Sequence, residues 1–492
     1  MRRSVWTVVG VLAWLGCGED VTGRSPIPDA PLVSGARIAE VSLYQGVKVP
    51  LAIEASVLEP RSLPVVVGRD ALLRVFVTPE SGWQQREVVV RLEGARGGSA
   101  LQPRESQQLV ASASFEADLS SSFNFELPGD ELTLDYEYRL SLREVDQAVA
   151  GPSPAARTPR DGSFAPLGAG SSGSSSKMVL VPIRYEGDGS GRLPDTSDEQ
   201  VERYRRLLFD RYPVPRVEVR VREPVTFAEP IAAFSDAWST LLQSVLAIRQ
   251  QDIVQGVATD DEYYYGLVEP APSFEQYCGQ DCLLGLTFQV EDAPLESHLR
   301  GSVGIGFAGE LAAETFVHEM GHAHGRKHAP CAPQFSSIED VDPQYPHPNA
   351  GLGSWGYSLS LRELVDPAGP ARDFMSYCEP TWVSDYTFAG LFQTIAAVNV
   401  ARDFLHSSES SSAFRAITVG AEGELALGVT LNVRGLPSGR PERVLVERPG
   451  GPPRAVTAYF HPHADHGGGM LLVSEAEIAG GRLRVRGRAL LP

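Results

Sequence analysis

Eleven consecutive residues at positions 318–328 decide the fold and the chemistry of this chain: His318-Glu319-Met320-Gly321-His322-Ala323-His324-Gly325-Arg326-Lys327-His328. Positions i and i+4 of a helix lie on one face, so His318 and His322 can bind one metal ion from adjacent turns. Glu319 projects beside them and can take a proton from an attacking water. Gly325 accepts the left-handed conformation that ends helices, which lets the chain turn and bring His328 to the same ion.

These residue types at this spacing predict a catalytic zinc site. Three neutral imidazoles and one open position form a catalytic zinc ligand set, and zinc lowers the pKa of water so that a nucleophile exists near neutral pH. Histidine is rare in the chain, 10 of 492 residues, so the complete pattern is a specific signal. We expect one Zn²⁺ per chain, held by His318, His322 and His328, with Glu319 as the general base. The alternative is a His-rich helix without a metal, or a degenerate protease.

The segment resembles the signature of the metzincin zinc endopeptidases, H-E-x-x-H-x-x-G-x-x-H, at all five fixed positions. That family also has a downstream turn containing methionine, and Asp373-Phe374-Met375-Ser376-Tyr377 fits it. The resemblance implies that Met375 forms a hydrophobic base under the imidazoles and that Tyr377 binds the metal or stabilises the oxyanion. It further implies an edge strand that pairs with the peptide substrate, for which 301–308 is the candidate.

Four cysteines, Cys278, Cys282, Cys331 and Cys378, follow the N-terminal Cys17. In an exported chain they suggest two disulfides, with three pairings open, whereas their spacing fits no zinc-ribbon pattern. The metzincin resemblance implies Cys331–Cys378, because each cysteine follows by three residues a position that the family places at the zinc. Cys278–Cys282 is then the second bridge.

The remaining sequence predicts a multidomain protein: a metzincin-like α/β (α+β) catalytic domain flanked by all-β domains. Short strand-like runs between turn residues predict an N-terminal β-sandwich over 36–150. A Gly/Ser-rich stretch over 151–177 is typical of a flexible linker, and the catalytic domain follows over 178–407. Strand patterns over 408–492 predict a C-terminal β domain. The insert 332–371 either shapes a substrate cleft or packs.

The N-terminus is typical of an export signal over 1–17, with Arg2 and Arg3 before an apolar stretch too short to span a bilayer. Leu15-Gly16-Cys17 resembles a bacterial lipoprotein processing site, which implies lipidation of Cys17. Residues 18–35 then form a linker. We expect an exported protein of the bacterial cell envelope or the extracellular medium; the alternatives are a plain secretory signal and an N-terminal anchor.

The net charge of −19 disfavours nucleic acid and anionic lipid as partners, because both attract basic surfaces. Contact with a membrane is expected only through a lipid anchor at Cys17. The expected partner is a protein or glycoprotein substrate, since the layout is similar to that of dictomallein-type proteases, which cut mucin-like glycoproteins. Two alternatives stay open: a binding protein built on a metzincin scaffold, and a zinc amidase acting on cell-wall peptides.

Two further features bear on the site. Cys17 is the one cysteine before the catalytic domain, so a masking thiol is not expected and latency would have to use another group. In the C-terminal domain, His461, His463 and His466 form an H-x-H-x-x-H cluster beside Gly467. Such clusters can bind metal, but this one is more typical of a loop.

Overall fold

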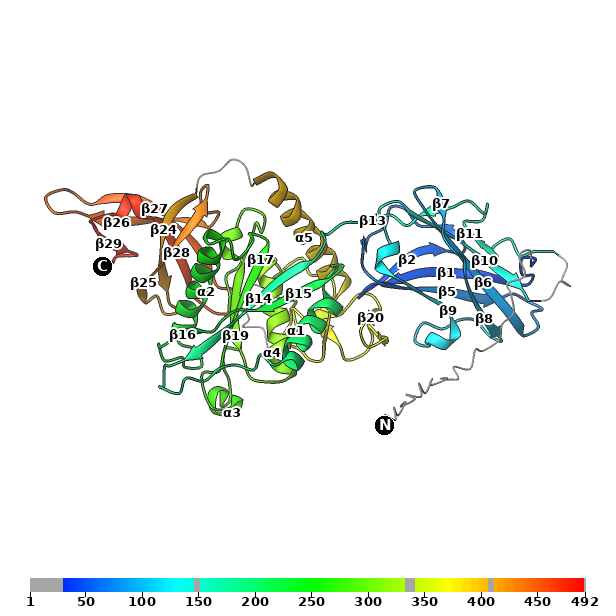
Figure 1. Ribbon diagram of the computed structural model, residues 1–492, viewed down its shortest axis with the longest axis horizontal. Coiled ribbons are helices and arrows are strands. Elements are labelled where there is room, and N and C mark those ends of the chain that lie inside the picture. The colour runs from blue at the N-terminus through cyan, green and yellow to red at the C-terminus, as the bar shows by residue number, and fades with distance from the viewer. Residues whose placement is uncertain (1–29, 146–150, 332–340, 406–410, 491–492) are drawn as a thin grey trace, which may run out of the picture.

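The computed structural model describes residues 30–145, 151–331, 341–405 and 411–490 of the chain (Figure 1). The N-terminal β domain, a mixed α/β region and a C-terminal β sheet follow one another along the longest axis of the molecule. This arrangement confirms the predicted multidomain organisation at that level. The export signal over 1–17, Cys17, most of the expected 18–35 linker and the start of the insert lie outside the described residues.

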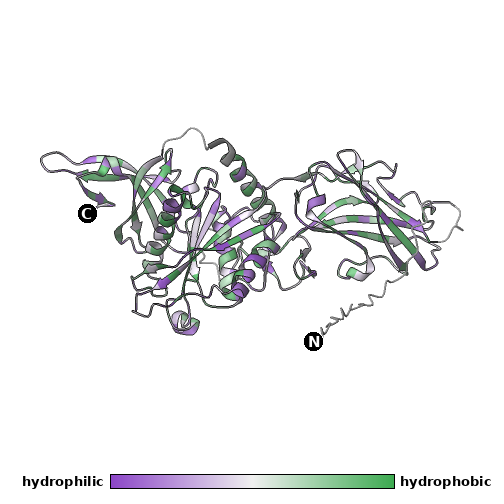
Figure 2. Ribbon diagram, viewed as in Figure 1, coloured by the Kyte–Doolittle hydropathy of each residue, from purple (hydrophilic) through white to green (hydrophobic). Residues whose placement is uncertain are grey.

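Two antiparallel sheets form the N-terminal domain, as the strand patterns over 36–150 predict. One has the order β3-β2-β1-β5-β9, and the other has β11-β10-β6-β7 with β8 and β12 attached. Figure 2 shows hydrophobic and hydrophilic residues alternating along these strands, the pattern expected when one face of each sheet is buried. The strands are β1 (Ala36–Tyr44), β2 (Lys48–Ile53), β3 (Ser56–Val57), β4 (Val65–Val66), β5 (Ala71–Pro79), β6 (Arg86–Arg96), β7 (Ser99–Ala100), β8 (Arg104–Val110), β9 (Phe123–Leu127) and β10 (Tyr136–Glu144).

The predicted flexible linker over 151–177 is wrong. Strands β11 (Arg157–Thr158) and β12 (Ala165–Pro166) both pair with β10, and β13 (Ala169–Gly170) pairs with β4. Ala156 and Leu167 are buried in the domain core, and burial of these apolar side chains holds the segment in place. The Gly/Ser composition concealed these anchoring positions. The connection between the domains is the short stretch between β13 and β14 (Ser176–Tyr185).

The α/β region is built on a twisted sheet with the order β15-β14-β17-β19-β18. Its strands pair in parallel, except that β18 runs antiparallel to β19 at the edge. The remaining strands of the sheet are β15 (Val217–Val221), β16 (Val225–Phe227), β17 (Glu262–Val268), β18 (Gly285–Thr287) and β19 (Gly301–Ile305). The expected substrate-pairing strand over 301–308 is therefore not at the edge: β19 lies between β17 and β18, and β18 has the edge position.

Helices flank this sheet and carry the candidate site (Figure 1). They are α1 (Asp198–Arg211), α2 (Ala237–Val254), α3 (Phe274–Cys278), α4 (Glu310–Ala323) and α5 (Asp385–Leu405). Short 3-10 turns lie at Leu119–Ser121 and Gly129–Glu131 in the N-terminal domain, and at Ser297–Leu299 and Pro348–Ala350 further along the chain. Helix α4 packs against β18, β19 and α1. Within the described ranges, the helices lack the combination of length and apolar composition that crossing a bilayer requires.

The described part of the insert packs against the N-terminal domain. It contains β20 (Gly356–Ser358) and β21 (Glu363–Val365), followed by β22 (Arg372–Asp373) and β23 (Thr381–Trp382). The backbone N–H of Lys48 donates to Trp355 O at 2.8 Å, and the rings of Tyr44 and Tyr357 make an edge contact. The buried guanidinium of Arg69 joins the same domains by donating to the carbonyls of Phe209 and Val214.

One antiparallel sheet of order β25-β24-β28-β27-β26-β29-β30 forms the C-terminal domain. Side chains such as Phe414 and Leu472 join the core shared with the α/β region, whereas Ile417 and Leu471 belong to a separate core. Gln243 of α2 donates to Thr418 at 2.7 Å, so the sheet is attached to α2. The elements are β24 (Ser411–Val419), β25 (Leu425–Arg434), β26 (Arg440–Glu447), β27 (Arg454–Pro462), β28 (Gly469–Ser474), α6 (Glu475–Ile478), β29 (Arg482–Val485) and β30 (Arg488–Leu490).

Candidate metal centre and active site

Helix α4 presents the first two predicted ligands, as the i, i+4 spacing predicts. Its N-terminus is fixed by Gln200, whose side-chain amide exchanges hydrogen bonds with the backbone N–H and C=O of Gly309, both at 3.0 Å. His318 and His322 follow one another along the helix, and their Nε2 atoms lie 3.1 Å apart. Their rings are almost perpendicular, so two lone pairs converge on one point beside the helix.

Gly325 ends the helix as predicted and returns the chain to the site. It has a φ of 76°, in the left-handed region, and Arg326 N donates to Gly321 O at 2.9 Å, which closes the last turn. A Cβ at position 325 would lie 3.1 Å from the carbonyl oxygen of Val290, so glycine also suits the space. The reversed chain brings His328, which is fully buried, within 4.6 Å of His322 between ring centroids.

Backbone carbonyls orient two of the three imidazoles. His318 Nδ1 lies 2.8 Å from Phe374 O, and His322 Nδ1 lies 2.7 Å from Arg326 O. A carbonyl oxygen can only accept, so each Nδ1 carries the hydrogen and each Nε2 presents a lone pair. Burial lowers the pKa of His322, which keeps this imidazole neutral. Fixing the tautomer through the second nitrogen is characteristic of histidines that ligate metals.

Asp465, from the loop between β27 and β28, is the fourth group at this point. Its Oδ1 atom lies 3.3, 3.1 and 2.8 Å from the Nε2 atoms of His318, His322 and His328. The four candidate ligand atoms all lie within 4.8 Å of one another. The sequence motifs did not predict this carboxylate as part of the site. The one available signal was its position inside the H-x-H-x-x-H cluster, whose histidines do not join a metal-ligand group within the described part of the chain.

The donor set fits a divalent cation. Lone pairs at Nε2 repel an anionic carboxylate oxygen at these distances, unless a cation lies among them. The second carboxylate oxygen of Asp465, Oδ2, is buried and has no hydrogen-bond partner among the described residues. Burying a carboxylate oxygen without a partner costs free energy, and a bound cation would provide the missing partner. Three imidazole nitrogens and one carboxylate oxygen are ligands that zinc takes in proteins.

Glu319 lies beside this donor set and next to the edge strand. Thr287 of β18 donates its hydroxyl hydrogen to Glu319 Oε2 at 2.6 Å. The carboxyl also lies over Gly285, where any Cβ would overlap it, so glycine at this position makes room for the acid. Burial raises the pKa of Glu319 well above its usual value, and the charge of Asp465 raises it further. A carboxyl with a raised pKa beside a metal site suits proton transfer.

The predicted methionine turn forms between β22 and β23. Met375 N donates to Asp373 Oδ1 at 2.8 Å, and Ser376 N donates to Asp373 O at 2.9 Å. The buried Met375 side chain packs directly on Gly321, one residue before the ligand His322. The turn also reaches the third-ligand segment, because Ala329 N donates to Met375 O at 2.9 Å.

Tyr377 follows this turn and places its phenol at the metal centre. Its ring stacks on His318 with the centroids 5.5 Å apart, and its hydroxyl donates to Asp465 Oδ1 at 3.0 Å. Burial raises the pKa of Tyr377, so the hydroxyl stays protonated and can donate. The structure therefore brings together Glu319, Tyr377 and the three histidines, as the sequence predicts.

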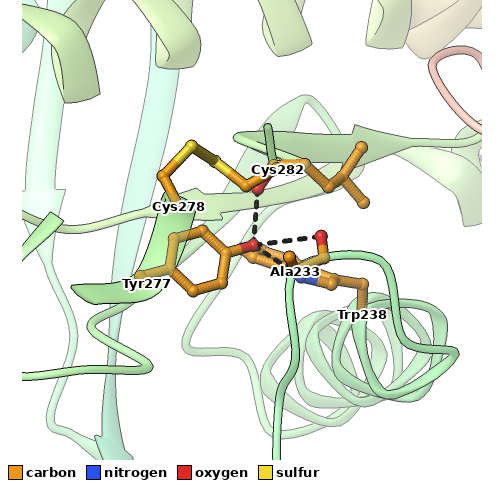
Figure 3. The surroundings of a disulfide bond; sticks show 6 residues. Ala233, Trp238, Tyr277, Cys278 and Cys282 are labelled. Carbon is orange, nitrogen blue, oxygen red and sulfur yellow. Dashed lines mark hydrogen bonds between the residues drawn. A yellow bond between two sulfur atoms is a disulfide. The ribbon is translucent and has the colours of Figure 1, made fainter. Parts of the chain in front are cut away.

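Both predicted disulfides form. Cys331–Cys378 ties the third-ligand segment to the methionine turn, and Cys278–Cys282 closes a small loop before β18 (Figure 3). Beside the small loop, Tyr277 donates to Leu283 O at 2.6 Å and accepts from Trp238 Nε1 at 3.1 Å. These contacts fix the chain that enters β18, and therefore the position of Thr287 beside Glu319.

Comparisons with known proteins place the site in a family. Residues 299–390, which include the three histidines, Glu319 and the methionine turn, match the family model described as Peptidase M66. No curated protein sequence matches the chain. One solved structure, titled "Structure of a chaperone-substrate complex", is 12% identical over 57% of this chain and 39% of that chain, with a TM-score of 0.26. The Peptidase M66 match, together with the converging histidines, shows that the chain carries a zinc metallopeptidase domain of the Peptidase M66 type over residues 299–390.

Proposed function

We propose that the chain is an exported endopeptidase that binds one zinc ion and hydrolyses peptide bonds within proteins or glycoproteins. The convergence of three imidazole Nε2 atoms beside the buried carboxyl of Glu319 carries this proposal. A protein that only binds its target has no chemical need for that carboxyl. The Peptidase M66 match supports peptide hydrolysis in particular.

The chain's own residues divide the chemistry among them. His318, His322 and His328 would hold the zinc, which when bound supplies a Lewis acid for the scissile carbonyl and lowers the pKa of water. Glu319 takes a proton from the attacking water and passes it to the leaving amine. Tyr377 donates a hydrogen bond to the oxygen that becomes negative in the tetrahedral state. Thr287 holds the carboxyl of Glu319 in place.

The edge strand β18 supplies a place for the substrate main chain. Edge strands can pair with an extended peptide through backbone hydrogen bonds, which demand little of the peptide's sequence. Specificity then depends on side chains around the site. The resemblance to dictomallein-type proteases favours mucin-like glycoproteins as the substrate class.

Export is part of the proposal. The signal-like residues 1–17 and two disulfides within the α/β region support a destination outside the cytoplasm, where thiols oxidise. Lipidation of Cys17 would hold the protein at the bacterial cell envelope. Labelling the expressed full-length chain with a radioactive fatty acid tests this point: label in the wild type and none in Cys17→Ala is expected, and equal label in both would contradict it.

Cleavage is tested with the chain from Gly18 and its Glu319→Ala variant, both loaded with zinc. Each is incubated with a denatured protein mixture and with a mucin-type glycoprotein, and new N-termini are sequenced by mass spectrometry. We expect new internal N-termini with the wild type alone. New termini that appear equally with both proteins, at one zinc per chain, would contradict the proposed mechanism.

A further inference from the structure

A segment of the C-terminal domain lies along the edge strand of the catalytic sheet. Gln289 N donates to Pro462 O at 2.8 Å, and Ala464 N donates to Thr287 O at 2.9 Å. Between these bonds, Phe288 and His463 form an antiparallel bridge. The segment 462–464 therefore extends the sheet by a short added strand, in the place where a peptide can pair with β18.

The next residue, Asp465, lies at the candidate metal centre. Asp465 directs Oδ1 to all three imidazole Nε2 atoms, the closest at 2.8 Å. Tyr377 donates to that same oxygen. This one carboxylate oxygen therefore occupies the fourth ligand position. It also accepts the hydrogen bond from Tyr377 that the proposed mechanism assigns to the oxyanion.

The contacts of this segment show that it is packed into the protein and is not a surface loop. His463 is buried, stacks on Phe288 with the centroids 5.0 Å apart, and places Nε2 3.1 Å from the hydroxyl oxygen of Ser239 in α2. Ala464 is fully buried. The chain leaves through Gly468, which has a φ of 93° and no room for a Cβ beside Val419 O. The sheet behind it is attached to α2.

We propose that the segment 462–465, hereafter the masking segment, is an internal inhibitor that keeps the peptidase latent. It pairs with the substrate-binding edge as a substrate main chain would, and Asp465 blocks the position of the attacking water. Substrate peptide can enter once the masking segment has left β18. This inference rests on the proposed function, and it identifies a carboxylate as the masking group in place of a thiol.

The test measures access to the metal rather than turnover. Acetohydroxamic acid, a small zinc chelator, is titrated calorimetrically into the zinc-loaded chain from Gly18 and into Asp465→Ala. A mask that leaves at most a tenth of the sites open weakens apparent binding about tenfold, so we expect the variant to bind at least about tenfold more tightly. Glu442→Ala is the matched control, because this carboxylate of the same domain pairs with Arg486 away from the site, and it should bind as the wild type does.

A second variant tests the mask even if Asp465→Ala fails to fold or to bind zinc. Ala464→Pro removes the N–H donated to Thr287 but keeps the carboxylate, and it should also bind acetohydroxamic acid more tightly than the wild type. Affinities equal to that of the wild type in both zinc-loaded variants would overturn the mask, as would weaker binding in both.

The outcomes separate the mask from the proposed function. Tighter acetohydroxamic acid binding in the variants, without cleavage of any protein, would uphold the mask and contradict the endopeptidase proposal. Unchanged binding, with cleavage by the wild type that depends on Glu319, would overturn the mask and leave the endopeptidase proposal intact.

Discussion

Asp465 Oδ1 lies 2.8 Å from His328 Nε2, although 137 residues separate the two in the chain. The histidine belongs to the loop that follows α4, and the aspartate belongs to the loop between two strands of the C-terminal sheet. The candidate metal centre is therefore assembled from two parts of the molecule. Any event that moves the C-terminal sheet relative to α2 changes the ligands available to the metal.

We expect the zinc content of the chain to depend on His322. We expect the wild-type chain to retain about one zinc per chain after desalting, and His322→Ala to retain almost none, because the variant loses the ligand at the centre of the set. His347→Ala is the control, since His347 pairs with Asp385 outside the site, and it should keep its zinc. Atomic emission spectroscopy measures the metal. Equal zinc in wild type and His322→Ala would contradict the assigned ligands.

In the proposed mechanism, Tyr377 contributes to turnover by donating a hydrogen bond to the oxyanion. In the Asp465→Ala background, where its hydrogen bond to Asp465 no longer matters, Tyr377→Phe should lower kcat about a hundredfold. KM should change little, because the interaction forms only as charge develops. Steady-state kinetics on a peptide taken from a mapped cleavage site would measure the effects on kcat and on KM separately. A rise in KM at unchanged kcat would mean that Tyr377 only binds substrate.

The two disulfides should differ in their effect on stability. Cys331 and Cys378 are 47 residues apart, whereas Cys278 and Cys282 are four apart. Closing the longer loop removes more entropy from the unfolded chain, so replacing both Cys331 and Cys378 by alanine should cost about 2–4 kcal/mol of unfolding free energy. The matched Cys278→Ala/Cys282→Ala variant should lose less. Urea unfolding of both variants, without reductant, shows which one loses more unfolding free energy. A larger loss in the Cys278→Ala/Cys282→Ala variant would contradict this account.

Acid should destabilise the contact between the C-terminal sheet and the 3-10 turn at Ser297–Leu299. Burial lowers the pKa of His461 from 6.5 to about 4, despite Glu296 Oε1 at 3.7 Å from its Nδ1. The unfolded chain therefore takes up a proton below about pH 6.5 that the folded chain accepts only near pH 4. The free energy of unfolding then falls as the pH drops through this window, by up to roughly 3 kcal/mol.

His461→Gln isolates that contribution. The variant lacks the titrating group, so its urea midpoint should fall less than that of the wild type over the same pH range. His298 faces His461, is also buried and remains in both proteins. Because the charge of His461 lowers the pKa of His298, the difference between the two midpoints contains this coupling as well as the titration of His461. Parallel pH dependences of the two midpoints would contradict the assignment.

Local pattern was enough to predict the metal-binding helix and its end. His318, His322 and Gly325 act through the geometry of one helix and one turn, and that geometry is the same in every protein. Met375 and Cys378 followed from resemblance to a family, because the turn that carries them has a short sequence signature.

Other features depend on contacts that composition does not reveal. Two buried apolar residues, Ala156 and Leu167, hold the Gly/Ser-rich segment on the N-terminal sheet against the expectation of a flexible linker. The prediction of an edge strand over 301–308 was wrong because alternating apolar residues indicate a strand but do not show which strands pair with it. Asp465 reaches the site only through the packing of a whole sheet on α2, and no spacing in the sequence encodes that approach.

The role of Glu319 is the central claim, and it is tested most directly once the mask has been removed. Zinc-loaded Asp465→Ala and Asp465→Ala/Glu319→Ala chains are incubated with a denatured protein mixture, and the new N-termini are counted by mass spectrometry. We predict many new internal termini with the first protein and a loss of at least about a hundredfold in cleavage rate with the second, at equal zinc content. Equal cleavage by the two proteins, or none by either at one zinc per chain, would contradict a peptidase that works through Glu319.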